Sequence, residues 1–266
     1  YALEQKYGGI LRGSIAIMRA ERKSNAPKVE KQIIYFKNGL AELPQLLVAA
    51  LGESVHANVS ISSIQKIGAG WRVDWNGKIN IYDEVLLTTP THALDKLPFD
   101  ESLQKALQPL LTIDYSPVSV LTVAFKRSDV AQPLDGFGML VPECEGRKIL
   151  GVLFPASLFA GRAPAGEVLL TVFVGGERQA ELAVPDKDTL LATVLPELNE
   201  LFGTTGEPTF SHHRHWPRAI PQYNLGYGKM LVQMDAIEKK FAGLKLAGNY
   251  RDGISLSYCI EAAVSK

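Results

Sequence analysis

The sequence predicts an α+β protein, and three patterns carry that prediction. Residues 71–82 hold two runs of alternating apolar and polar side chains joined by an Asn-Gly pair, the pattern of a tight antiparallel hairpin. Strongly apolar runs follow one another through glycine- and proline-rich connections, so we expect an antiparallel sheet from residues 118–125, 149–154 and 168–174. Helical spacing of apolar residues also recurs, most clearly at residues 188–202.

The first part of the chain combines a helix with short strands. Apolar residues recur at helical spacing between residues 38 and 52, where Gly52 ends the pattern. A short strand region follows at residues 55–64. After the hairpin, residues 85–90 form an apolar run that a proline ends, which is typical of a fully buried strand.

The second part places further helices around the predicted sheet. The helix at residues 188–202 has a candidate N-cap at Asp186 or Asp188 and a candidate helix-ending glycine at Gly203. Four further elements are expected: a strand at residues 210–216, a helix at 230–241, a short strand at 244–247 and a helix start at 257–264.

Composition and charge exclude several classes of function. Lys plus Arg and Asp plus Glu each number 28, so the formal net charge is zero, which argues against a broad nucleic-acid footprint. No apolar run reaches about 18 residues, so we expect no transmembrane helix. Cys144 and Cys259 are the two cysteines. They cannot build a disulfide framework, and they fit a reducing, cytoplasmic setting.

The most specific local signal is a strand that turns through Gly248 and Gly253 into a helix. A helix start offers free backbone N–H groups and the positive end of the helix dipole. It can hold a phosphate, or donate hydrogen bonds to an electron-rich ring. A plain strand-to-helix turn is the alternative at this point.

The strand predicted after the long helix carries histidines and a run of cations and aromatics. On a strand, His213 and His215 share one face and His212 lies on the other, so a zinc site is not indicated. The run from Arg214 to Arg218 includes Trp216. It can hold an anionic substrate or stack on a flat ring, and a solvated strand end is equally compatible.

No hydrolase elbow, zinc-protease motif or nucleotide-binding P-loop occurs in the sequence. We therefore assign no catalytic residue and no metal ligand. Leu140, Leu153 and Phe173 lie among the apolar strands. They are either core residues or the wall of a flat apolar pocket.

Six motifs in the same order resemble the oxygen-dependent protoporphyrinogen and coproporphyrinogen oxidases, which are amine-oxidase-like flavoproteins. They lie at residues 134–142, 150–154, 161–164, 171–176, 216–223 and 247–253. In that fold an FAD domain is built from separated segments, with a substrate domain inserted between them. The resemblance implies four segments. Residues 1–37 would be the end of the substrate domain with a connecting loop, and residues 38–91 would be an FAD-domain segment. Residues 92–240 would form the substrate domain, and residues 241–266 the last FAD-domain segment.

Members of the resembled family begin with a strand and a G-x-G-x-x-G turn that binds the FAD pyrophosphate. This sequence contains no such turn, and residues 1–7 read as the middle of a helix. This chain corresponds to about the last two-thirds of the sequence of a family member. We therefore expect the chain to be the C-terminal part of the enzyme.

The resemblance implies that a porphyrinogen is oxidised to a porphyrin in haem biosynthesis, by hydride transfer to FAD with O2 as acceptor. Alternatives are a desaturase or amine oxidase of the same fold, and a flavin-free module that binds a tetrapyrrole or a protein partner. The sequence does not separate protoporphyrinogen from coproporphyrinogen. An apolar substrate suggests peripheral contact with a membrane, and neither that contact nor a homodimer is decided by the sequence.

The resemblance also carries site residues over to this chain. Val59 resembles the position whose backbone meets the adenine end of FAD. Four residues of this chain resemble family positions at the flavin: Trp216, Ile254, Ser255 and Leu256. Three others resemble the family's apolar residues on either side of the tetrapyrrole: Leu140, Leu153 and Phe173.

Overall fold

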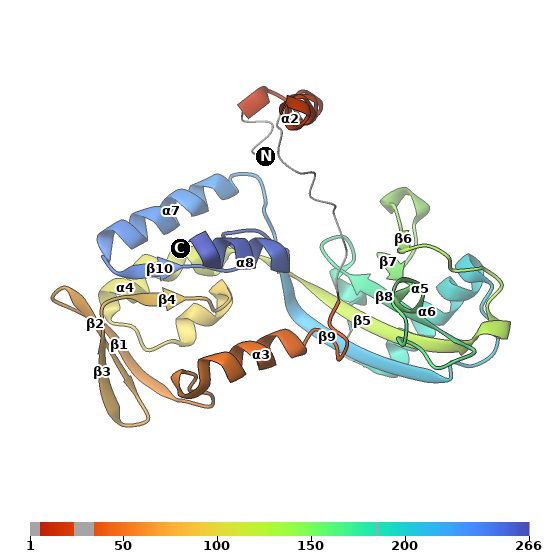
Figure 1. Ribbon diagram of the computed structural model, residues 1–266, viewed down its shortest axis with the longest axis horizontal. Helices are drawn as coiled ribbons and strands as arrows, with labels where there is room; N and C mark the ends of the chain where they lie inside the picture. The colour runs from red at the N-terminus through yellow and green to blue at the C-terminus, as the bar shows by residue number, and fades with distance from the viewer. Residues whose placement is uncertain (1–5, 24–34, 185, 266) are drawn as a thin grey trace. The chain divides into compact units, whose positions relative to one another are not determined.

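The computed structural model describes residues 6–23, 35–184 and 186–265 (Figure 1). The chain forms two compact units, Tyr1–Val55 and His56–Lys266. The first unit contains α2 (Ile10–Lys23) and α3 (Glu42–Leu51). Gly52 ends α3, which confirms the predicted helix with a later start. The mid-helix interpretation of residues 1–7 lies largely outside the described residues.

The second unit begins with the predicted hairpin. Three antiparallel strands form one sheet, β1 (Ile61–Ile67), β2 (Gly70–Trp75) and β3 (Lys78–Tyr82). Asn76 and Gly77 connect β2 to β3, and both have positive φ, at 48° and 73°. This is the backbone of a type I′ turn, so the hairpin prediction is confirmed.

A short parallel pair joins segments that are far apart in the sequence. β4 (Val85–Leu87) lies beside β10 (Leu244–Leu246). The prediction of a fully buried strand at residues 85–90 is wrong, because Leu86 is 51% exposed while Leu87 is buried. Successive side chains point to opposite faces of a strand, and only the Leu87 face packs into the core.

That core includes a helix that is absent from the sequence prediction. α4 (Glu101–Leu107) begins where the Asp100 carboxylate accepts a hydrogen bond from the Leu103 N–H at 3.0 Å. Leu103 and Leu107 are both buried one turn apart. They pack in a cluster that also takes in α7 (Tyr227–Lys240) and β10. An Asp N-cap followed by leucines at helical spacing is the signal that identifies α4.

The predicted antiparallel sheet is present and has five strands. Their spatial order is β6 (Gly138–Leu140), β7 (Gly151–Leu153), β8 (Glu167–Gly175), β5 (Tyr115–Lys126) and β9 (Phe210–Pro221). All neighbouring pairs are antiparallel. The strand predicted at residues 210–216 therefore continues to residue 221.

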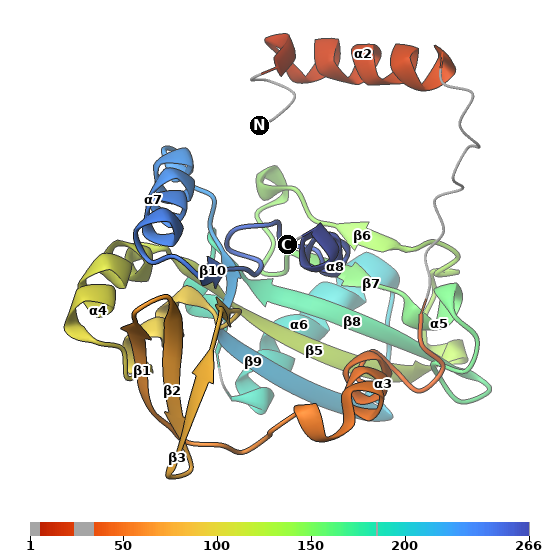
Figure 2. The ribbon, with the colours of Figure 1, turned by 60° about the vertical axis from the view of Figure 1, so that its left-hand side comes forward.

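One face of this sheet is covered by α6 (Lys187–Phe202), as Figure 2 shows. The Asp186 carboxylate accepts from the Thr189 N–H at 2.7 Å, and Gly203 ends the helix with φ of 60°. Both predicted caps are confirmed. Leucine and valine side chains of α6 pack against Leu121 and Val172 of the sheet. The opposite sheet face carries mainly half-buried and exposed side chains, although Val118 and Ala124 of β5 are buried there.

The remaining helices are α5 (Pro155–Leu158) and α8 (Leu256–Ser265). Gly248 and Gly253 both adopt positive φ between β10 and α8, at 137° and 118°. This confirms the strand, glycine turn and helix that the sequence predicts. Within the ranges that the structure describes, no helix is long and apolar enough to cross a bilayer.

The α6 side of the sheet also holds two of the histidines. His213 Nε2 and His215 Nδ1 each lie 3.2 Å from Ser119 Oγ, which donates to the Val184 carbonyl at 2.9 Å. The predicted sharing of one face is therefore confirmed. Because the single hydroxyl proton goes to Val184, the two ring nitrogens act as donors to Ser119.

We expect His213 to make stability pH-dependent. Burial lowers the pKa of His213 below its usual value, the neighbouring His215 lowers it further, and Asp186 opposes the shift. The unfolded chain therefore binds this proton more readily, so the free energy of unfolding should fall as pH drops below about 6.5. His213→Gln should flatten this slope in urea unfolding curves measured from about pH 5 to 7. His212→Gln, on the exposed face, is the control, and an unaltered slope in His213→Gln would contradict the assignment.

Candidate functional site

Strand register brings the three residues predicted at the substrate to one face of the five-stranded sheet. Leu140 on β6 pairs with Gly151 on β7, and Gly151 pairs with Phe173 on β8. Leu153 lies opposite Gly138 in the next row. Directly opposed residues of antiparallel strands project on the same side. Leu140, Leu153 and Phe173 therefore share the face that points away from α6.

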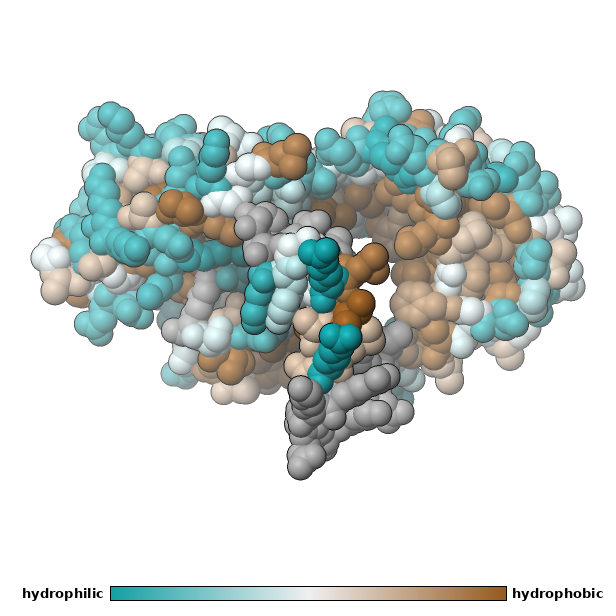
Figure 3. Space-filling model, turned by 90° about the horizontal axis from the view of Figure 1, so that it is seen from above, coloured by the Kyte–Doolittle hydropathy of each residue, from teal (hydrophilic) through white to brown (hydrophobic). Residues whose placement is uncertain are grey.

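This face is apolar around Leu140 and Phe173 and only partly buried, and the row of Leu153 continues with Thr171 and Thr122. Leu140 is 86% exposed, and Leu153 and Phe173 are half-buried, so the alternative of a core role is wrong for Leu140. The adjacent glycines allow close strand pairing: a Cβ at Gly138 would lie 2.4 Å from the Val152 carbonyl oxygen, and one at Gly151 would lie 2.6 Å from that of Met139. Figure 3 shows apolar side chains gathered over this sheet, on the right of the view.

β9 extends the same face with a cation and an aromatic ring. Val120 on β5 pairs with Phe173 on one side and with Arg214 on the other. Trp216, two residues after Arg214 on β9, pairs with Val118 on β5 and is 47% exposed. The guanidinium carbon of Arg214 lies 4.6 Å from the centre of the Trp216 ring, a cation–π contact. The apolar face therefore ends in a cation–π pair of Arg214 and Trp216.

Two tyrosines connect the segment after β9 to the turn before α8. The Tyr223 hydroxyl donates to the Asn249 carbonyl, and the Tyr227 hydroxyl donates to the Tyr250 carbonyl. Burial raises the pKa of Tyr227, which keeps its phenol protonated as a donor. The structure thus links the strand that carries Trp216 to the turn that carries the other predicted flavin residues.

The start of α8 has the properties of a ring-binding helix end. Ile254 and Leu256 are 48% and 47% exposed. Ser255 Oγ accepts from the Tyr258 N–H at 3.2 Å. The N–H groups of Leu256 and Ser257 have no acceptor among the residues that the structure describes. Free N–H donors beside apolar side chains suit the edge of a flat, electron-rich heteroaromatic ring.

Val59 lies elsewhere in the second unit, immediately before β1. The neighbouring Ser60 N–H donates to Asn76 Oδ1 at 3.1 Å, so this segment is held by the hairpin turn. Val59 itself is half-buried. Its role at a cofactor stays a prediction.

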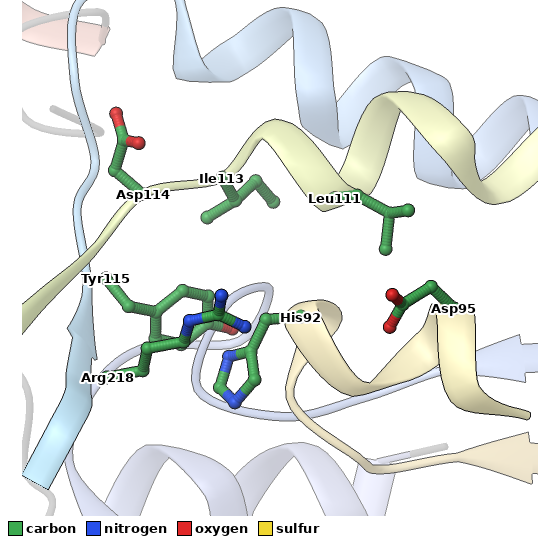
Figure 4. Close-up of a pocket in the computed structure, with 7 residues that line it drawn as sticks. All are labelled: His92, Asp95, Leu111, Ile113, Asp114, Tyr115 and Arg218. Carbon is green, nitrogen blue, oxygen red and sulfur yellow. The ribbon is translucent and has the colours of Figure 1, made fainter.

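A polar cavity of about 320 Å³ opens near the start of β5 (Figure 4). It is lined by His92, Asp95, Leu111, Ile113, Asp114, Tyr115 and Arg218. The His92 ring stands edge-on to the Tyr115 ring, with centroids 4.7 Å apart. In the described part of the chain, the buried His92 Nδ1 has no hydrogen-bond partner.

His92 contributes a neutral ring to that cavity. Burial lowers its pKa, Arg218 and Lys96 lower it further, and Asp95 opposes them. Of the lining residues, the sequence singles out only Arg218. The others come from separate segments that spacing along the chain does not connect, so only the tertiary fold identifies this cavity.

The comparisons with known proteins agree with this architecture. The family of flavin containing amine oxidoreductases matches residues 1–265. Mitochondrial protoporphyrinogen oxidase of Nicotiana tabacum is 38% identical over 189 residues, which cover 68% of this chain and 37% of that protein. Protoporphyrinogen oxidase 2 of Arabidopsis thaliana is 29% identical over 288 residues, covering 98% of this chain and 56% of the relative.

A solved structure gives the same result at the level of the fold. A protein from Exiguobacterium sp. 255-15, described as a candidate protoporphyrinogen oxidase, superposes with a TM-score of 0.74 and 24% identity. The match covers 99% of this chain and 55% of that one. The chain spans about half the length of most of these relatives. The predicted fold class, an α+β amine-oxidase-like flavoprotein, is therefore confirmed.

This protein is thus of the flavoprotein oxidoreductase class. More narrowly, the chain belongs to the family of flavin-containing amine oxidoreductases.

Proposed function

We propose that this chain provides the substrate-binding face and part of the flavin site of an FAD-dependent porphyrinogen oxidase. The observation that carries the proposal is the row of Leu140, Phe173 and Arg214 across the five-stranded sheet, with Trp216 at its edge. The relatives named protoporphyrinogen oxidases support the substrate class.

The chemistry of the face fits a broad, apolar macrocycle with a polar rim. Half-buried Leu153 and Phe173 offer apolar contact area, and exposed Leu140 extends it. Burial of such area favours binding of a tetrapyrrole by about 25 cal/mol per Å². The face carries no acid–base dyad among its paired positions, which suits a reaction whose chemistry a cofactor performs.

The start of α8 fits the flavin ring of FAD. The free N–H groups of Leu256 and Ser257 can donate to the ring, and the helix dipole favours the negative charge that it gains on reduction. Ile254 and Trp216 can pack on its apolar edge. When bound, FAD would accept the hydride from the meso carbon of the substrate, with O2 as the final acceptor. This chain's residues would position the ring and exclude water.

We extend the proposal to the division of the chain. The parallel pairing of β4 with β10 supports one FAD-domain body for the part of segment 38–91 that lies in the second unit and for segment 241–266, with the substrate domain at 92–240. Residues of α4 and α7, near the two ends of 92–240, pack in the same cluster as β4 and β10, so the substrate domain proper is centred on the five-stranded sheet. A cytoplasmic location, peripheral membrane contact and a homodimer stay predictions.

An oxidase assay tests the proposed function. The flavin-loaded enzyme should convert protoporphyrinogen or coproporphyrinogen in air to a fluorescent porphyrin, with H2O2 formed in step. The flavin absorbance bands should persist through desalting. A flavin-loaded enzyme that oxidises neither substrate faster than the buffer alone would contradict the proposal.

Trp216→Ala should weaken flavin retention. Loss of one aromatic contact of about 1.5 kcal/mol would raise the Kd for FAD about tenfold. The ratio of flavin to protein absorbance after desalting measures the effect, with far-UV circular dichroism to verify folding. Trp75→Ala, in the remote hairpin, is the matched control. Equal flavin content in the two variants would remove Trp216 from the flavin site.

A further inference from the structure

We propose that Arg214 binds a propionate carboxylate of the porphyrinogen, and this inference rests on the proposed function. The substrate is an apolar macrocycle whose only anionic groups are propionates at its rim. A face that holds the apolar ring therefore needs a cation at its border. Arg214 lies in the same cross-strand row as Leu140 and Phe173.

The distances along the row suit this assignment. Neighbouring strands are about 4.8 Å apart, so Arg214 on β9 lies about 10 Å from Phe173 on β8 and about 19 Å from Leu140 on β6. A ring resting between Leu140 and Phe173 would thus point part of its rim at β9. A propionate is long enough and flexible enough to span the remaining gap.

The donors of Arg214 are available for a ligand. Some other arginines of the described residues pair with carboxylates, as Arg72 does with Asp74 at 2.7 Å and Arg251 does with Asp235 at 2.7 Å. Among the residues that the structure describes, no carboxylate lies within ion-pair distance of Arg214. Its paired neighbour Val120 is uncharged. Arg214 is exposed, so an incoming carboxylate can reach its guanidinium and form charge-assisted hydrogen bonds.

The contact with Trp216 restrains this guanidinium. Its central carbon lies 4.6 Å from the centre of the indole ring. A cation–π contact of this kind leaves N–H donors available for a carboxylate. Arg214 is therefore held ready for two parallel hydrogen bonds to one carboxylate, and lysine cannot reproduce that geometry.

A comparison of acid and ester isolates the charge. The probes are protoporphyrin IX and its dimethyl ester, each titrated into flavin-loaded enzyme and followed by the porphyrin absorbance band. Arg214→Gln should raise the Kd for the free acid about 10- to 100-fold, the loss of one charge-assisted hydrogen-bonded pair. It should leave the Kd for the ester unchanged. Arg214→Lys should recover part of the loss, since it keeps the charge without the fork.

Lys126→Gln is the matched control. Lys126 ends β5 six residues from Val120, on the same sheet face and about 20 Å away. Its loss should leave both Kd values unchanged. Equal weakening of acid and ester in Arg214→Gln would overturn the carboxylate role and leave the proposed function standing. A wild-type enzyme that binds neither probe would instead overturn the proposed function itself.

Discussion

Phe173→Ala is expected to raise the KM for the porphyrinogen roughly 10- to 100-fold and to change kcat little. The phenyl ring lies in the middle of the proposed binding row, between Gly151 and Val120. Its removal takes away apolar contact worth about 1.5–3 kcal/mol. In the proposed role the ring would contact the substrate equally in the ground and transition states, so the loss should appear as weaker binding. Initial rates at varied porphyrinogen concentration measure both constants.

Leu169→Ala is the control for this experiment. Leu169 lies on β8 four residues before Phe173, on the same face and also half-buried. It should lose stability without a comparable change in KM. Since Phe173 is half-buried, its own stability cost should fall short of the about 3–5 kcal/mol known for a fully buried phenylalanine. A wild-type KM in Phe173→Ala would mean that this ring does not touch the substrate.

Trp71→Ala should cost about 3–5 kcal/mol of unfolding free energy. Trp71 is fully buried, and its indole N–H donates to the Ala242 carbonyl at 3.2 Å. It therefore ties the hairpin to the turn that leads into β10, the strand before the proposed flavin turn. Gly243 must be glycine there, because its φ is +84° and a Cβ would lie 2.7 Å from the Asp83 carbonyl oxygen. Urea unfolding followed by far-UV circular dichroism measures the loss.

Trp75→Ala provides the comparison for Trp71. Trp75 lies on the same strand but is half-buried, and its ring contacts His56 with centroids 4.7 Å apart. It should lose clearly less stability, because truncating it leaves no cavity in the core. A similar loss in the two variants would show that the indole at position 71 is not the anchor of this core.

Several local elements follow from the sequence alone because neighbouring residues determine them. Asn76 and Gly77 tolerate the positive φ that a type I′ turn requires, so the hairpin follows from two residues. Asp186 and Gly203 fix the two ends of α6 through its first N–H groups and a left-handed residue. α4 is missing from the prediction although its cap and leucine spacing are equally local.

The burial of the short strands was less predictable. The apolar run at residues 85–90 favours a strand covered on both faces, and its composition cannot show how many neighbours will flank it. In the structure β4 has one partner, β10, which lies more than 150 residues away in the chain. Leu86 is exposed for that reason.

The sequence identified the candidate site residues, and the tertiary structure decided which of them lie on the same face. Motifs single out Leu140, Leu153, Phe173 and Trp216 one by one, but a motif contains no information on strand register. Register places them on one face with Arg214, because a shift by a single residue would turn a strand's side chains to the other side. The polar cavity around His92 likewise exists only where separate segments converge. Turns and caps are decided by local backbone chemistry, whereas binding faces arise from the pairing of strands that are distant in the sequence.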